Sequence, residues 1–335
     1  MKARLLLLAV GALAAAGAAG AGGLRGTSPA ARGSAGAAPV RIVYVNNASS
    51  AGPFAAVIRN GFEAACRLYE VDCSYRSTTN RTFDPAEEAR LIDRAVAEKP
   101  DGLMVTDSSP KALNPHIRAA VLAGIPVIID NTGAGQAGAP TGALTYVGND
   151  ERESGRLAGD LLAGAGVKRL LVIAVEPGLE LADQRLAGLR QGFRRAGKLT
   201  TIRVALADLA DAGRVRRLID GALRRDRAID GVFSIGQLFN APMLAERAAL
   251  GSRATRIRWA SVDLGPEAVA ALRRGQMEFA LDQQQWLQGY LPVEFLAFYV
   301  RYGFTPPTPF VRTGPSVVTP RTIGKYVAAL RNGMR

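Results

Sequence analysis

Polar side chains that could bind a hydroxyl-rich ligand recur along this chain, each directly after a short apolar run. A sugar hydroxyl donates to a carboxylate and accepts from an amide or a guanidinium, and an aromatic side chain can cover the apolar face of the ring. Phe54 and Trp286 are candidates for that aromatic contact. About half of the polar residues could instead cap helices or make turns. The polar candidates are Asn46-Asn47, Asp107, Asp130-Asn131, Asn149-Asp150, Glu176, Asp263 and Asp282-Gln283.

The residue types needed for catalysis or for a metal site are scarce. The one histidine, His116, lies in a helical, surface-facing pattern, and a Ser-His-Asp triad would need it at a strand end. One histidine and two closely spaced cysteines do not make an ordinary zinc site, and no glycine-rich phosphate loop is present. We therefore expect no metal and no cofactor. A hydrolase using Asp130, Asp263 and Asp282 is a weaker alternative, because nothing marks a nucleophile or a proton donor.

The two cysteines, Cys66 and Cys73, are seven residues apart. One lies in a helical pattern and the other in a strand pattern. A disulfide that closes a small loop and a pair of buried thiols both fit this arrangement. Neither interpretation is catalytic.

The elements that must position the polar residues alternate between two hydrophobic periods. Short β-branched runs predict strands, and apolar residues at helical spacing predict helices. Asp84, Pro85 and Glu87 mark one helix start as N-cap, first and third residue. In the first half we expect strands at 41–46, 71–76, 102–106, 126–130 and 144–147, and helices at 53–69, 85–97 and 111–123. In the second half we expect strands at 169–175, 201–205, 231–235, 256–262 and 278–283, and helices at 151–163, 182–196, 213–224, 242–250, 266–274 and 287–302.

This alternation predicts an α/β fold with two doubly wound parallel-sheet domains, joined by a hinge and with a ligand cleft between them. The chain of 335 residues is long enough for two cores. Ligands of such sheets bind beyond the carboxyl ends of the strands, which is where the polar residues fall. The composition, 48% apolar and 21% charged, excludes a disordered, collagen-like or polytopic membrane chain.

The formal net charge of +13 does not by itself indicate nucleic acid. The arginines are spread over helical patterns and interleaved with aspartates, as in the segment from Asp211 to Asp226. A solvated helix face explains this pattern better than a phosphate-binding surface.

The first residues have the layout of an export signal. Lys2 and Arg4 precede the apolar run 5–10, and the small residues that follow include Ala19-Gly20-Ala21. We expect a cleaved signal peptide at 1–21, with an uncleaved anchor as the alternative, and a flexible linker at 22–40. The mature protein is then periplasmic.

Several short segments occur in an order that resembles one known family. The sequence is similar, over about residues 41–330, to the periplasmic solute-binding proteins of bacterial ABC sugar importers, the ribose-binding-like group with the type 1 periplasmic-binding fold. The segments are GPF at 52–54, GFEAA at 61–65, KPDG at 99–102, AGIPVI at 123–128, YVGND at 146–150, RLAGL at 185–189, IDGV at 229–232, SVD at 261–263 and DQQQWLQGYLP at 282–292.

The resemblance implies a set of sugar contacts at the rim of the cleft, outside the cores. These contacts fall on Phe54, Asn131, Arg185, Asp263 and Gln283. The strand-end pattern adds Asn47, Asp107 and Asn149, and the need for an aromatic contact adds Trp286. An arginine offers a planar fork of donors and an aspartate accepts from two hydroxyls. The alternative for Arg185 is a surface position on its helix, like that of Arg190 and Arg194.

The sequence departs from the family pattern at three positions. Ala55 stands where a second aromatic is common, Asn131 replaces an aspartate typical of ribose binders, and no Asn or Asp accompanies Gly236, although Gln237 is adjacent. A hexose, another pentose or a cyclitol is therefore expected as much as ribose.

The resemblance also implies how the protein works. It implies an N-terminal lobe at 41–146 with 285–312, a C-terminal lobe at 147–284 with 313–331, and hinge crossings near 147–149, 283–285 and 312–315. A monosaccharide or polyol closes the lobes, and the closed form delivers it to an ABC permease at the cytoplasmic membrane. The alternative is a periplasmic sensor subunit that docks on a chemoreceptor or histidine kinase.

Other partners are not expected. The related lactose-repressor-like regulators need a DNA-reading helix-turn-helix before residue 41, where an export signal stands instead, so no nucleic acid is expected. We expect a monomer that is not an enzyme.

Overall fold

The computed structural model of this protein describes residues 38–47, 52–79 and 84–335. Within this range, Pro39–Arg335 form one compact unit. The signal peptide expected at 1–21 lies outside the described residues, and so does the linker expected at 22–40 except for its last three positions. No helix in the described part of the chain is long and apolar enough to cross a membrane.

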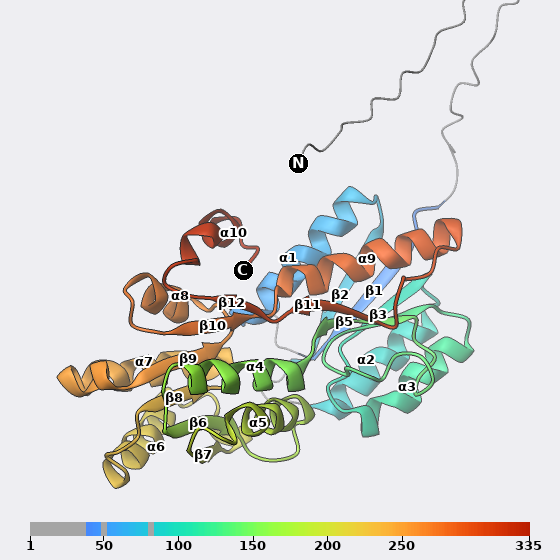
Figure 1. Ribbon diagram of the computed structural model, residues 1–335. Helices are drawn as coiled ribbons and strands as arrows, with labels where there is room; N and C mark the ends of the chain where they lie inside the picture. Colours follow the sequence, from blue (N-terminus) through green and yellow to red (C-terminus); the bar gives the residue numbers. More distant parts are fainter. Residues whose placement is uncertain (1–37, 48–51, 80–83) are drawn as a thin grey trace, which may run out of the picture. The chain divides into compact units, whose positions relative to one another are not determined.

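The first sheet has six parallel strands in the order β11-β5-β4-β3-β1-β2 (Figure 1). Its central strands are buried on both faces, which explains why apolar residues follow one another there without alternation, as in LMV of β3 and VII of β4. The strands are β1 (Arg41–Asn46), β2 (Asp72–Ser77), β3 (Gly102–Val105), β4 (Val127–Asn131), β5 (Thr145–Asn149) and β11 (Phe310–Gly314).

Four helices cover the first sheet: α1 (Pro53–Leu68), α2 (Pro85–Ala97), α3 (Pro110–Leu122) and α9 (Gln285–Tyr302). Helices α1 and α9 lie side by side and share one apolar cluster with the sheet, whereas α2 and α3 belong to the cluster on the other face (Figure 1). The close approach of α1 and α9 requires glycine: a Cβ on Gly289 would stand 1.9 Å from the Ile58 carbonyl oxygen. Asp84 caps α2 by accepting from the Glu87 backbone N–H.

The second sheet also has six strands, in the order β12-β10-β9-β8-β6-β7, and only β12 runs antiparallel to its neighbour. One apolar cluster fills the space between this sheet and its helices. The strands are β6 (Arg169–Val175), β7 (Lys198–Val204), β8 (Gly231–Ser234), β9 (Arg258–Val262), β10 (Phe279–Asp282) and β12 (Ser316–Val318). The helices are α4 (Glu151–Gly164), α5 (Glu180–Phe193), α6 (Ala212–Arg225), α7 (Asn240–Ala249), α8 (Pro266–Arg273) and α10 (Val327–Arg331), with short 3-10 turns η1 (Leu206–Asp208), η2 (Gln237–Phe239), η3 (Gly251–Arg256) and η4 (Ile323–Tyr326).

The chain passes between the two sheets three times. It leaves the first sheet after Asn149 toward α4, returns after Asp282 toward α9, and leaves again after Gly314 into β12. Each passage is only a few residues long. Several short connections of this kind let two halves of a protein turn relative to one another, because the backbone dihedral angles need to change only in the connections and hardly inside either half.

The expected fold class is confirmed by these two six-stranded sheets and by the solved relatives described below. Helix α5 ends at Phe193, three residues before its predicted end, and the strand β7 begins at Lys198 and not at Thr201. It is an edge strand whose first residues are exposed or half-buried, so its apolar pattern is weak where the strand starts. Helix α9 likewise begins two residues earlier than predicted, at Gln285.

Two smaller expectations are resolved by the structure. Cys66 on α1 and Cys73 on β2 form a disulfide, the first of the two arrangements left open by the sequence. His116 lies on α3 and its Nδ1 is 2.7 Å from a carboxylate oxygen of Asp93, so it belongs to a surface pair, as the helical pattern predicted.

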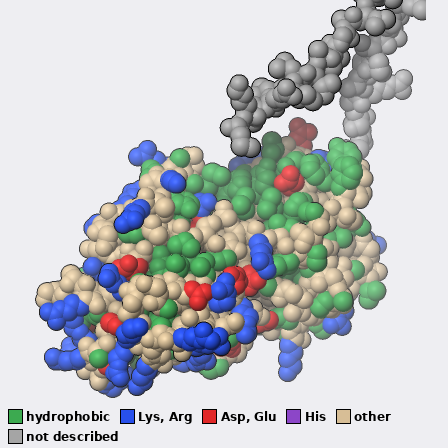
Figure 2. Space-filling view, in the orientation of Figure 1, with side chains coloured by type: hydrophobic (Ala, Val, Ile, Leu, Met, Phe, Trp, Pro, Cys, Tyr) green, Lys and Arg blue, Asp and Glu red, His purple; other side chains and the backbone are tan. Residues whose placement is uncertain are grey.

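The arginines of α6 face solvent, as predicted. Figure 2 shows Lys and Arg side chains gathered over the region of α6 and α7. Four of the five arginines of α6 lie within 4.0 Å of a carboxylate: Arg214 near Asp208, Arg216 near Glu246, Arg217 near Asp211 and Arg224 near Asp220. Their charges are partly compensated on the surface.

Candidate functional site

A cavity of about 450 Å³ lies where the carboxyl ends of both sheets meet. This size is within the range of roughly 300–1,000 Å³ that is typical of small-molecule sites. Six of the nine residues singled out from the sequence line it: Asn47, Phe54 and Asn131 from the first sheet, and Arg185, Asp263 and Gln283 from the second sheet and the passage that leaves it.

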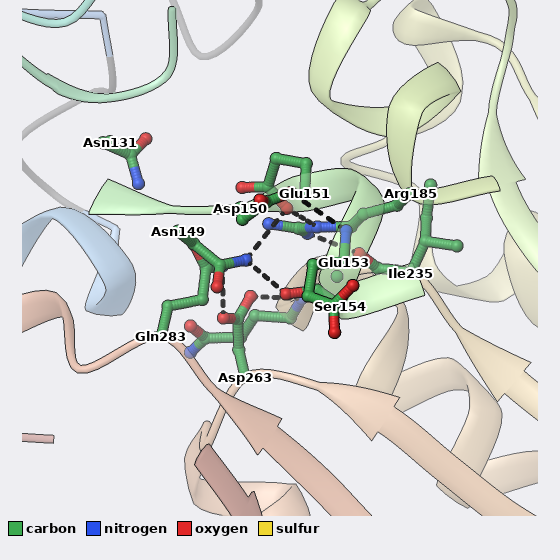
Figure 3. Close-up of polar contacts among 12 residues, drawn as sticks. Asn131, Asn149, Asp150, Glu151, Glu153, Ser154, Arg185, Ile235, Asp263 and Gln283 are labelled. Atoms are coloured by element: carbon green, nitrogen blue, oxygen red, sulfur yellow. Dashed lines mark hydrogen bonds and ion pairs between the residues drawn. The ribbon is translucent and has the colours of Figure 1, made fainter. Parts of the chain in front are cut away.

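Arg185 is the main cationic group of this cavity. Its Nε donates to Glu151, and its Nη1 donates to the backbone carbonyl of Ile235 at 2.6 Å (Figure 3). Burial lowers the pKa of the Arg185 guanidinium, but the charges of Glu151 and Asp263 outweigh it and raise the pKa, so the side chain stays charged. The remaining N–H groups form a fixed donor fork at the cavity wall.

The structure corrects the expected position of Arg185. The resemblance implies a position at the rim of the cleft and outside the core, but Arg185 is only 4% exposed. Helices α4 and α5 pack so closely that a Cβ on Gly155 would stand 1.9 Å from the Arg185 carbonyl oxygen. This contact brings the Arg185 side chain against Glu151 at the start of α4. Arg190, on the same helix, and Arg194, at its end, are exposed, whereas Arg185 is buried. The surface alternative for Arg185 is therefore excluded.

Asp263 supplies one of the three carboxylates that line the cavity, the others being Glu151 and Glu267. It follows β9 with a positive φ of 75°, a conformation that turns the side chain inward from the strand end. Its Oδ1 accepts from Gln283 Nε2 at 2.7 Å and from Gln285 Nε2 at 3.2 Å, and its Oδ2 accepts from the Gln237 backbone N–H at 3.2 Å. Burial raises the pKa of Asp263, while Arg185 acts in the opposite direction. The carboxylate is thus held in place and keeps acceptor capacity for ligand hydroxyls.

Two amides complete the polar set. Gln283 is buried and its Oε1 has no hydrogen-bond partner among the described residues. Asn131 ends β4 with φ 58° and donates from Nδ2 to Gln288 Oε1 at 2.8 Å. Figure 3 shows Asn131 apart from the group formed by Arg185, Asp263 and Gln283. The cavity therefore offers donors and acceptors from two sides.

Three predicted residues do not line this cavity. Asn149 points into the protein, where its Nδ2 donates to Glu151 Oε2 at 3.1 Å and to Ser154 Oγ at 2.7 Å, so it positions Glu151. The Trp286 ring stacks on Tyr290 with 4.6 Å between ring centroids and covers no part of the cavity. A strand-end position alone does not define where the Asn149 side chain points, and the aromatic character of Trp286 does not define what its ring packs on.

Asp107 is the third of these residues. It lines a much smaller neighbouring cavity, which also contains Glu180. Burial, together with the charge of Glu180, raises the pKa of Asp107 to about 7. Neither of its carboxylate oxygens has a hydrogen-bond partner among the described residues.

The carboxylates considered for a hydrolase do not come together in the cavity. Asp130 accepts from the Tyr44 hydroxyl at 2.6 Å and from the Thr106 hydroxyl at 3.0 Å, so it faces the interior of the first sheet. Asp282 accepts from the backbone N–H of Gln284 at 3.0 Å. Of the three, only Asp263 reaches the cavity. The described residues also contain no group of three His, Cys, Asp or Glu side chains that could hold a metal ion.

Sequence reasoning missed several residues that build the site. Glu151 lines the cavity and pairs with Arg185, although in the sequence it reads only as the first residue of a helix. Gln288 supports Asn131 from α9, and Thr313 donates to the Gln283 carbonyl at 2.7 Å. The repeated glutamines at 283–288 are the one signal that could have pointed to part of this network.

The protein has two α/β halves joined by three short passages, and the cavity between them is lined by fixed hydrogen-bonding groups. This arrangement defines a two-lobed ligand-binding protein. A family model described as a periplasmic binding protein domain matches residues 42–303, and the chain belongs to that family. Its members are solute-binding proteins and not enzymes.

Known proteins extend this assignment. The chain is similar to a carbohydrate transporter from Acidothermus cellulolyticus 11B, whose structure was solved in complex with myo-inositol. The two chains are 31% identical with a TM-score of 0.79, and the match covers 89% of this chain and 100% of that chain. The xylose/arabinose-binding protein of Sulfolobus acidocaldarius is 26% identical over 87% of this chain and 74% of that protein. A periplasmic ribose ABC transporter structure from Conexibacter woesei has 24% identity and a TM-score of 0.73 over 89% and 98% of the two chains, and supports the fold alone.

Proposed function

We propose that this protein captures a neutral sugar or polyol in the 450 Å³ cavity and delivers it to an ABC permease at the cytoplasmic membrane. The observation that carries the proposal is the fixed set of Arg185, Asp263 and Gln283. It combines a charged donor fork, a carboxylate acceptor and an amide, which together satisfy hydroxyls that both donate and accept. The relatives named above bind sugars or contain myo-inositol, which supports the same ligand class.

Closure of the two halves explains how the cavity would hold such a ligand. Asn47, Phe54 and Asn131 belong to one half, whereas Arg185 and Asp263 belong to the other. A ligand that bridges both sets makes all its hydrogen bonds only when the halves are close, so it favours the closed state. We infer that the lobes 41–146 with 285–312 and 147–284 with 313–331 turn about the three chain passages.

The proposal is tested by calorimetry and thermal denaturation of the purified protein after chelation of metals. A panel of myo-inositol, D-xylose, arabinose and ribose should contain a ligand that stabilises the protein by about 2.7 kcal/mol at 100 times its dissociation constant. Asp263→Asn should weaken that binding at least tenfold, and Asp220→Asn, on the exposed side of α6, should leave it unchanged. Binding that requires added metal, or a preference for sugar phosphates, would contradict the proposal.

We also propose that the protein works in the periplasm after removal of residues 1–21. The charged, apolar and small-residue segments of the N-terminus support this location. N-terminal sequencing of the native protein should find a start between about residues 19 and 40. A cytosolic protein with intact Met1 would show the proposed location to be wrong.

A further inference from the structure

The cavity is polar at one end of the second sheet and apolar at the other. In the strand order β10-β9-β8-β6-β7, Gln283 follows β10 and Asp263 follows β9. The loops after β6 and β7 instead contribute Leu179, Leu206 and Leu209. Arg185 lies on α5 after β6, but its side chain reaches the Ile235 carbonyl after β8. The leucines therefore lie toward the β7 edge of the cavity, and Asp263 and Gln283 lie toward its β10 edge.

Leu238 marks the point between these two parts. It follows β8, lines the cavity and is 64% exposed, which is high for a large apolar side chain. Leu206 and Leu209 are each only partly buried against the core of the second half. Core packing therefore accounts for part of their surface, and both side chains also line the cavity.

A sugar or cyclitol with free hydroxyls all round would not use such a wall. Each hydroxyl placed against aliphatic carbon loses its hydrogen bonds to water without replacement, which is unfavourable. An alkyl or aryl group on the ligand is favoured against this wall, because the contact removes apolar surface of both the group and the leucines from water. Phe54, on the opposite side of the cavity, adds an aromatic face.

We propose that the ligand is a neutral sugar or cyclitol that bears an apolar substituent, such as an alkyl or aryl glycoside or an O-alkyl ether. Its hydroxylated ring lies at Arg185, Asp263 and Gln283, and its substituent lies against Leu206, Leu209 and Leu238. This inference rests on the proposed function and specifies its substrate class.

Matched ligand pairs test this inference by calorimetry on the purified chain. D-xylose is compared with its phenyl α- and β-xylopyranosides, D-glucose with its phenyl glucosides, and myo-inositol with its mono-O-methyl ethers. We expect the substituted member of at least one pair to bind at least tenfold more tightly than its parent. If the parents bind and no substituted member gains affinity, the inference is wrong and the proposed function stands. If no member of any pair binds, the inference is wrong, and the arabinose and ribose measurements of the panel above decide the proposed function.

Two variants locate the effect. Leu238→Asn should weaken binding of the substituted ligand severalfold more than binding of the parent sugar. Leu122→Asn is the matched control, because Leu122 is 87% exposed on α3 and does not line the cavity. The control should keep both affinities. If Leu238→Asn weakens parent and substituted ligands equally, the leucines serve closure of the halves, and the inference is overturned.

Discussion

Replacing Arg185 by alanine should lower both ligand affinity and the stability of the ligand-free protein. Arg185 is 4% exposed and its partner Glu151 is 3% exposed, so the substitution leaves a buried carboxylate without its cation. Removing one partner of a buried ion pair costs about 3–5 kcal/mol. At about 2–4 °C per kcal/mol, the melting temperature should fall by roughly 6–20 °C.

The loss of stability in Arg185→Ala should depend on pH. Burial already raises the pKa of Glu151 in the native protein, and Arg185 opposes that rise. Without Arg185 the pKa of Glu151 rises further. A carboxyl with a higher pKa in the folded than in the unfolded chain binds more protons when folded, so the free energy of unfolding decreases as pH increases through this interval. The deficit of the variant should therefore be larger at about pH 8 than at about pH 5.

Thermal denaturation followed by circular dichroism at several pH values measures this effect. Arg194→Ala is the matched control, because Arg194 is exposed at the end of the same helix. The double variant Arg185→Ala with Glu151→Gln should recover part of the lost stability and show a weaker pH dependence. The reasoning is refuted if Arg185→Ala melts like Arg194→Ala at every pH, since Glu151 would then not need its partner.

Three further predictions concern the framework of the site. Asp107→Asn should raise the melting temperature, and more at pH 8 than at pH 5. Because burial raises the pKa of Asp107 to about 7, this carboxyl lowers the free energy of unfolding progressively as the pH rises from its unfolded pKa of about 4 to about 7. An equal effect at both pH values would contradict this reasoning. Reduction of the disulfide between α1 and β2 should cost about 2–3 kcal/mol in urea unfolding for its short loop; an unchanged midpoint would show that it adds no stability. Gly155→Ala should lower both the melting temperature and ligand affinity, because the added Cβ would stand 1.9 Å from the Arg185 backbone. The control Gly164→Ala should lower neither, since no atom lies within 4 Å of a Cβ added there. Similar behaviour of the two variants would mean that the contact between α4 and α5 can relax freely.

The elements of this fold could be predicted from the sequence because their hydrophobic periods are local. The strands Arg41–Asn46 and Arg169–Val175 and the helix Pro85–Ala97 have the predicted bounds, since each has a clear apolar pattern and a defined start. The edge strand β7 was predicted too short, because an edge strand needs fewer apolar residues. Local patterns thus define an element best where it is buried.

Residue type and position after a strand were enough to select Asp263, Gln283 and Asn131 as candidates, because the carboxyl ends of parallel strands share one edge of a sheet. The direction of each side chain was not accessible in the same way. Asn149 also ends a strand, yet it turns inward to bind Glu151, and Trp286 packs on Tyr290. These outcomes depend on backbone dihedrals and on partners far away in the sequence.

The sequence by itself determined the alternation of strands and helices, the family resemblance and the polar candidates at the strand ends. Only the tertiary structure decided that Glu151 pairs with Arg185 and that leucines line one end of the cavity. Both facts arise from long-range packing: α4 meets α5 through glycines that permit backbone contact, and the strand order of the second sheet places loops from distant parts of the chain side by side. A local pattern of residues predicts neither the contact between two helices nor the order of strands in a sheet.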